Sequence, residues 1–273
     1  MSIDNTAQLT LFSLILMRMS GFILMNPILG RNNIPVRVKG GFIFILTMTV
    51  YSASMEEAIE IASTVEFGFL LFKEFAAGYV IGYVMHLFFF IVSFAGYVID
   101  YQIGLSMATV YDPQSNAQMP VTGSVYQAWL IMLFFAVDGH LALMKILLTS
   151  AEIVPYGGIV LTQGLALKII DIFLECVGMG VRLAIPMIAA EFLVEMGVGI
   201  LNKVVPQISI FVINLSFGSF DSPILFFHLL SYFQMKLIVG LGLLALLYAP
   251  AGEFIEKIMT TMIKTVQGIL TFL

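Results

Sequence analysis

The sequence has few of the residues on which most metal sites and nucleic-acid-binding surfaces depend. Its 273 residues include one cysteine, three histidines and 12 Lys or Arg, with a formal net charge of -5. The lone Cys176 excludes an intrachain disulfide and a cysteine-based metal cage. No histidine belongs to an H-E-x-x-H pair, the spacing by which one helix presents two zinc ligands. The basic residues form no block that would follow nucleic-acid phosphates. We expect no metal, no cofactor and no nucleic-acid partner.

The chain also lacks the patterns that mark catalytic sites. It contains neither a G-x-S-x-G nucleophile turn nor a G-x-x-x-x-G-K-[ST] phosphate-binding loop. Asp138 and His140 lie two residues apart, so on a helix their side chains point in different directions and make a poor acid–base couple. The sequence therefore predicts that the protein is not an enzyme.

Apolar residues, in contrast, are abundant. Hydrophobic residues make up 60% of the chain and charged residues 11%, and the mean hydropathy is +1.03; ordinary soluble domains are roughly 45–50% apolar and about 25% charged. A helix needs about 20 apolar residues to cross a bilayer. We predict an all-α, polytopic integral membrane protein of long helical hairpins, a single domain over residues 1–273. About six hydrophobic segments are expected, of which 40–54 and 237–248 are the short ones: 9–29, 40–54, 67–99, 126–148, 165–201 and 237–248.

A loop is expected between the third and fourth of these segments, at residues 100–121. Asp112, Pro113, Asn116 and Pro120 are residues typical of turns. The first part of this loop is nevertheless apolar, for example at Leu105. We therefore expect the loop to lie buried against protein.

The C-terminal residues 253–273 have the period of an amphipathic helix. Apolar residues recur at spacings of three and four and share one face. Such a helix lies on a membrane surface or docks on a partner, and the sequence favours neither. The apolar face comprises Ile255, Ile258, Met259, Met262, Ile263, Val266, Ile269 and Leu270.

Charged residues interrupt the apolar segments. A charge at the bilayer centre costs about 2.5–3.5 kcal/mol on insertion scales, so these side chains cannot all face lipid. Two like-charged pairs, Asp171 with Glu175 and Glu191 with Glu195, have i, i+4 spacing and need cations or water nearby. The carboxylates act either as a proton or ion relay, or as ion-pair partners between subunits and at membrane edges. The full set is Arg18, Lys73, Glu74, Asp138, Lys145, Asp171, Glu175, Arg182, Glu191 and Glu195.

Three blocks of sequence occur in a characteristic order: GYVIDYQIGLSMATVYDPQSNAQMP at 96–120, FFAVDGH at 134–140, and LAIPMIAAEFLVEMGVGILNKVVPQISIF at 183–211. Together they resemble the FliR/SctT family of type III secretion export-gate subunits. The positions that carry the resemblance are Gly104, Leu105, Ala108, Gly139, His140, Pro186, Pro206, Gln207 and Phe211.

The resemblance implies a function in protein export. Members of this family form a helical gate with FliP-like and FliQ-like subunits, beside FlhB-like and FlhA-like components, in the bacterial cytoplasmic membrane. Unfolded flagellar or effector proteins pass through it. It also implies a pore plug loop at matching positions: Tyr111, Asp112, Pro113, Gln114, Ser115, Asn116, Ala117, Gln118, Met119 and Pro120.

Two alternatives and one departure accompany this resemblance. The blocks favour the flagellar branch and its basal body over an injectisome subunit. A second alternative, a stand-alone proton-coupled transporter, would use the intrahelical carboxylates and should show internal symmetry, which we do not detect. The family passes quickly from the P-Q block to its next apolar helix, whereas here residues 218–233 intervene as an insertion.

Overall fold

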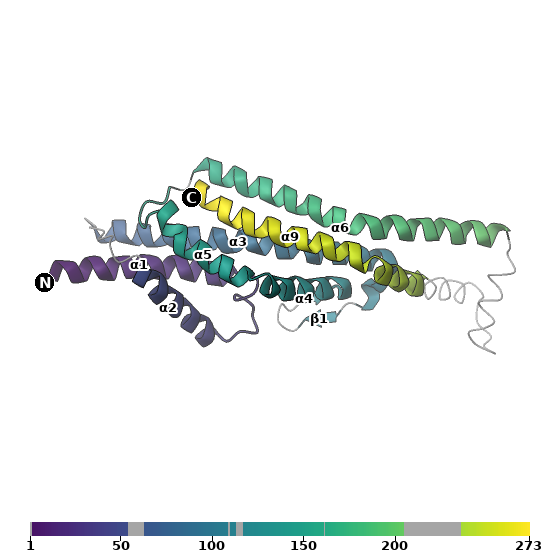
Figure 1. The fold of residues 1–273 in the computed structure, drawn as a ribbon, viewed down its shortest axis with the longest axis horizontal. Helices are drawn as coiled ribbons and strands as arrows, with labels where there is room; N and C mark the ends of the chain where they lie inside the picture. The colour runs from purple at the N-terminus through teal and green to yellow at the C-terminus, as the bar shows by residue number, and fades with distance from the viewer. Residues whose placement is uncertain (1, 54–62, 109, 113–116, 161, 205–235) are drawn as a thin grey trace.

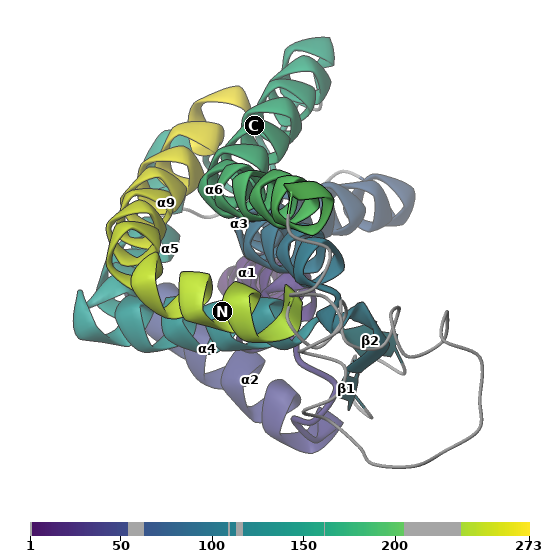
Figure 2. The ribbon, with the colours of Figure 1, turned by 90° about the vertical axis from the view of Figure 1, so that its right-hand side faces the viewer.

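Helix α3 (Thr64–Ile103) is the axis around which the other helices pack. The computed structural model describes residues 2–53, 63–108, 110–112, 117–160, 162–204 and 236–273. Seen along the long axis of the molecule, α3 lies between α1 (Ser2–Met25) and α6 (Gln163–Val204) (Figure 2). With 40 residues, α3 is about 60 Å long at 1.5 Å per residue, roughly twice the hydrocarbon thickness of a bilayer.

The remaining helices complete an elongated bundle (Figure 1). Among the described residues, four helices are long and apolar enough to cross a membrane, or up to six segments if each bent pair counts as one span. The prediction of a polytopic α-helical membrane protein is thereby confirmed. The other helices are α2 (Val36–Ala53), α4 (Val121–Ala136), α5 (Gly139–Ile153), the helix Lys236–Leu246, α9 (Tyr248–Ile269) and the 3-10 turn η2 (Leu270–Phe272).

Two short strands lie in the connection between α3 and α4. After the 3-10 turn η1 (Leu105–Ala108), β1 (Val110–Asp112) pairs antiparallel with β2 (Ala117–Met119). In this register Val110 stands opposite Met119. The architecture remains helical, and this small hairpin is the addition that hydropathy alone did not predict.

The loop expected at 100–121 begins later than its sequence suggests, because residues 100–103 remain in α3. Gly104 ends the helix with φ of 83°, a left-handed conformation that glycine adopts without steric cost. The helix can include Asp100 because this side chain has partners outside α3, described below.

Each bent pair consists of two helices with a short break between them. Helices α4 and α5 meet at 69°, and between them Asp138 has φ of 54°. The helix Lys236–Leu246 meets α9 at 58°. Pro250 lies in the first turn of α9, where a missing N–H costs nothing.

The apolar face of α9 is buried within this chain. Ile255, Ile258, Met259 and Val266 are at most 2% exposed, and α9 packs on α3, α4, α5 and α6. The chain end is held too, because the Val160 N–H donates to the Leu273 carbonyl at 3.2 Å. The structure shows neither of the two alternatives expected for this helix, because its apolar face packs against other helices of the same chain.

Helices α1 and α3 pack closely through glycines. A Cβ at Gly21 or Gly78 would overlap with the backbone of the opposite helix, and one at Gly82 would lie 2.7 Å from the Phe22 carbonyl oxygen. Gly78 and Gly82 have the i, i+4 spacing of small residues that lets two helices pack closely.

Candidate functional site

The base of the hairpin between α3 and α4 is held by a carboxylate. Pro120, the N-cap residue of α4, offers no side-chain cap. Asp100 of α3 accepts hydrogen bonds from the Thr122 N–H, at 3.3 and 3.2 Å, and from the Thr122 hydroxyl. Asp100 and Thr122 are 1% and 5% exposed. Since a helix N-terminus favours negative charge, Asp100 supplies from α3 the cap that α4 lacks.

Two further contacts close this base. The Gln127 side-chain amide donates to the Ser93 hydroxyl at 2.6 Å. One turn away, Gly96 and Gly123 approach so closely that a Cβ at Gly96 would overlap with the Gly123 backbone. The two ends of the loop, at the end of α3 and the start of α4, are therefore fixed to each other.

The structure places the predicted loop residues as follows. Tyr111 and Asp112 lie in β1, and Ala117, Gln118 and Met119 lie in β2. Leu105 and Ala108 belong to η1, and Pro120 is buried. The remaining loop residues lie outside the described part of the chain: Pro113, Gln114, Ser115 and Asn116.

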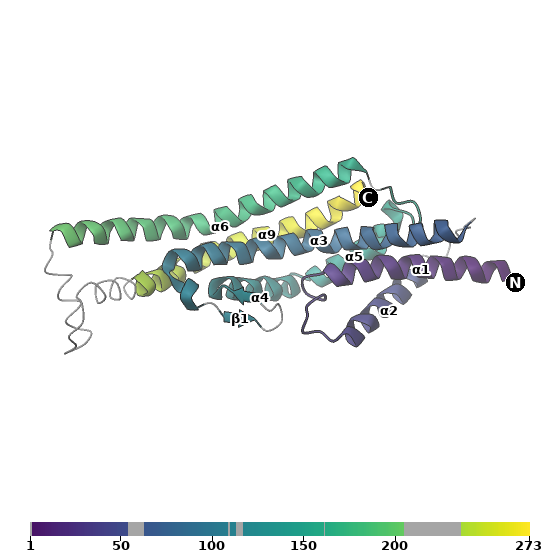
Figure 3. The same cartoon turned by 180° about the vertical axis from the view of Figure 1, so that it is seen from behind.

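The other predicted family positions are not gathered into one site. Gly139 starts α5, where a Cβ would lie 2.6 Å from the Phe134 ring. His140 is exposed beside the Phe135 ring, with 5.5 Å between ring centroids. Pro186 lies within α6, which bends in its middle part (Figures 1 and 3), as proline in a helix explains. Pro206, Gln207, Phe211 and the insertion 218–233 fall outside the described residues.

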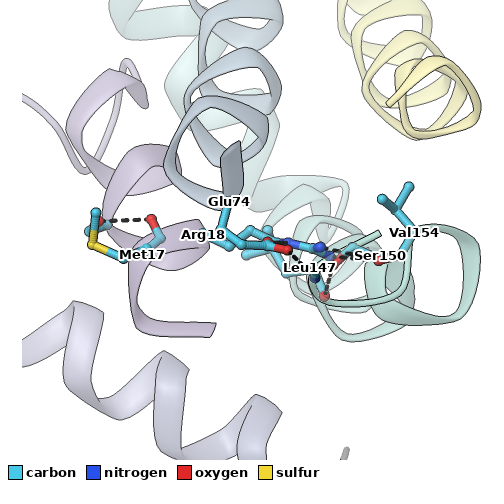
Figure 4. A network of polar contacts seen from close by, with 8 residues as sticks. Met17, Arg18, Glu74, Leu147, Ser150 and Val154 are labelled. Carbon is cyan, nitrogen blue, oxygen red and sulfur yellow. Dashed lines mark hydrogen bonds and ion pairs between the residues drawn. The ribbon is translucent and has the colours of Figure 1, made fainter. Parts of the chain in front are cut away.

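A second polar site is buried between α1, α3 and α5 (Figure 4). Arg18 donates through Nε to Glu74 at 2.6 Å, and the two side chains are 2% and 0% exposed. The Arg18 Nη atoms donate to the Val154 carbonyl, both at 3.1 Å, and Nη1 also to the Ser150 hydroxyl at 3.4 Å. The second Glu74 oxygen accepts from the Gly157 N–H at 2.9 Å.

This network satisfies both charges inside the bundle. The Arg18 guanidinium also lies over the Tyr156 ring, 4.3 Å from its centroid, an attractive cation–π arrangement. The sequence showed that Arg18 and Glu74 need partners other than lipid. It did not pair them, because they are 56 positions apart and only the packing of α1 on α3 brings them together.

Most charged residues of α6 are exposed, unlike the buried Arg18 and Glu74. Asp171, Glu175 and Arg182 are exposed, and Glu195 pairs with Lys236 of the following helix. In the described part of the chain no group of three or more His, Cys, Asp or Glu side chains could hold a metal ion. What the arrangement can do chemically is pair charges and fix helix ends.

These features define a polytopic helical membrane protein whose α3–α4 hairpin is fixed at its base. The chain belongs to the bacterial export proteins, family 1, whose model matches residues 9–239. Among its relatives is the flagellar biosynthetic protein FliR of Escherichia coli K12, 29% identical over 94% of this chain and 91% of the relative.

Two other relatives span both branches of the family. FliR of Bacillus subtilis 168 is 28% identical over 75% of this chain and 80% of the relative. The Yop proteins translocation protein T of Yersinia pestis is 25% identical over 76% and 81%. The chain is thus a membrane-embedded component of a type III protein-export system, and it works in a complex with other components of that system.

Proposed function

We propose that this protein is a core subunit of a flagellar type III export gate, and that its α3–α4 hairpin plugs the pore. In this proposal the chain assembles with FliP-like and FliQ-like subunits beside FlhB-like and FlhA-like components, in the bacterial cytoplasmic membrane at the flagellar basal body. Unfolded flagellar proteins are the cargo. The protein performs no covalent chemistry.

The observation that carries the proposal is the construction of the hairpin. Non-helical backbone at membrane depth is tolerated only where protein or a water-filled cavity surrounds it. Residues 104–120 follow helix α3, which is about 60 Å long. The Asp100–Thr122 cap and the Gly96–Gly123 contact hold the two ends of this connection together. A loop whose two ends are fixed to each other is suited to close a pore without detaching from its wall.

The flagellar branch is favoured by the relatives. The Escherichia coli FliR match is 29% identical over 94% of this chain, whereas the Yop translocation match is 25% identical over 76%. An injectisome subunit remains the second candidate within the same family.

Removing residues 112–119 tests the plug directly. In cells that express the assembled gate, this deletion should increase the leak of ions across the cytoplasmic membrane, because nothing else in the proposal closes the pore. Membrane conductance is the measurement. An unchanged conductance, with the variant shown by native mass spectrometry to be present in the complex, would contradict the plug assignment.

A milder variant tests the base of the hairpin. Asp100→Asn weakens the acceptor for Thr122, and loss of a helix cap costs about 0.5–2 kcal/mol. We expect a leak smaller than that of the deletion, together with faster hydrogen exchange in residues 104–120. Glu253→Gln, an exposed change on α9, is the matched control and should alter neither.

A further inference from the structure

Helix α6 and the helix Lys236–Leu246 bring two carboxylates to one cation. Lys236 forms an ion pair with Glu195, and their side chains are 20% and 28% exposed. Glu191 lies one helical turn before Glu195 and is fully buried. Among the described residues, neither carboxylate oxygen of Glu191 has a hydrogen-bond partner. Both properties are unusual for a glutamate, because a buried charge is normally paired.

Other cations are too far away to neutralise Glu191. Its charged neighbours are Lys236 and Glu195. Along α6 the nearest basic residues are Arg182 and Lys203, about 14 and 18 Å away along the helix axis at 1.5 Å per residue. The sequence of residues 205–235 contains no Lys or Arg, and its one imidazole, His228, is mostly neutral at pH 7 when unperturbed. With both glutamates ionised, the three side chains would carry a net negative charge.

An uncompensated carboxylate in a low-dielectric interior is unfavourable, and the group binds a proton instead. We propose that Glu191 is a proton-binding site. The carboxylic acid is protonated at neutral pH, which makes the cluster of Glu191, Glu195 and Lys236 neutral. When the O–H bond breaks and the proton passes to water, the Glu191 carboxylate competes with Glu195 for Lys236.

The site lies beside the end of α3. The helix Lys236–Leu246 begins with the cation of this site, and the turn that follows Lys236 packs against α3. That turn contains Gly240, where a Cβ would overlap with the Ile103 side chain. Ile103 is the last residue of α3. Loss of the proton therefore changes the packing next to the start of the hairpin, whether or not that hairpin is a plug.

Infrared spectroscopy of the full chain in lipid nanodiscs, with ¹³C-labelled glutamate, tests the proposal. At pH 7 we expect the carbonyl band of a protonated glutamic acid, which weakens as the pH is raised. Glu191→Gln should remove the band, while Glu256→Gln, an exposed change on α9, should leave it. Because glutamine has the shape and neutrality of the protonated acid, the Glu191→Gln protein should melt at the same temperature as the wild type.

A second variant distinguishes two reasons for the protonation of Glu191: that it shares Lys236 with Glu195, or that it is buried without any cation. In Glu195→Gln, Lys236 loses its partner and becomes available to Glu191, so Glu191 should ionise and the band should disappear at pH 7. A band that survives Glu195→Gln would overturn the shared site. A wild-type spectrum without the band at pH 7, or a band retained in Glu191→Gln, would overturn proton binding itself.

Discussion

Helices α3 and α6 are almost equal in length, 40 and 42 residues, and both are apolar enough to cross a membrane. Their surroundings differ. In the apolar part of α3, 61% of the residues are buried within the chain, against 22% for α6. Helix α3 is the core of this subunit, whereas α6 offers most of its surface to lipid or to other subunits. Two helices of similar length and hydropathy therefore need not have the same role in the fold.

The same contrast holds for charge. The Arg18–Glu74 pair on the α3 side is buried and has further hydrogen bonds on both partners. The Glu195–Lys236 pair on α6 is partly exposed. A buried charge that loses its partner is strongly unfavourable, while an exposed one is solvated. Three pairs of variants sharpen this comparison.

The largest effect is expected for the ion pairs. Arg18→Met leaves the Glu74 carboxylate buried without its cation and should cost about 3–5 kcal/mol of folding stability. Lys236→Met removes the cation of a partly exposed pair and should cost about 0–1 kcal/mol. Thermal unfolding of the purified chain in detergent measures both. In the double variant Arg18→Met with Glu74→Met, part of the stability should return, and equal losses for Arg18→Met and Lys236→Met would break the comparison.

A comparable pair concerns aromatic side chains. Phe88 on α3 is fully buried, and Phe192 on α6 is 55% exposed. Phe88→Ala should destabilise the chain by about 3–5 kcal/mol, and Phe192→Ala by about 0.5 kcal/mol or less when the chain is alone. Melting temperatures of the isolated chain give the first answer. If α6 is an interface, Phe192→Ala should then reduce the yield of the assembled gate.

The smallest effect is expected for glycines. A Cβ at Gly78 would overlap with the Arg18 backbone, whereas Gly178 on α6 has nothing within 4 Å of that position. Gly78→Ala should cost about 1–3 kcal/mol by forcing α1 from α3. Gly178→Ala should stabilise the helix by up to about 1 kcal/mol. Changes of the same sign at both positions, measured by thermal unfolding, would contradict the packing described for α3.

Much of the fold followed from local patterns. The hydrophobic segment at 67–99 located the central helix α3, and the period of the C-terminal residues identified the buried face of α9. Such patterns work because neighbours on a helix face meet the same surroundings. The segment expected at 237–248 runs across the break between Leu246 and Tyr248, because a proline such as Pro250 starts a helix as readily as it ends one and so does not locate the break.

The candidate site was predicted only in part. Turn residues and family blocks located the loop before α4. They did not identify Asp100 as the cap of α4, because that role depends on where Thr122 lies in space. In the sequence, Glu191 and Glu195 are equivalent members of an i, i+4 pair of like charges. The structure distinguishes them, because Lys236 forms its ion pair with Glu195.

The sequence by itself determined the class of environment and the family of this protein. Composition alone is sufficient for the first, because a chain that is 60% hydrophobic and 11% charged cannot bury its apolar surface in water. The tertiary structure alone decided which charges meet, which helix is the core and where α9 docks. Each of these depends on contacts between residues distant in sequence, and such contacts form only when whole helices pack.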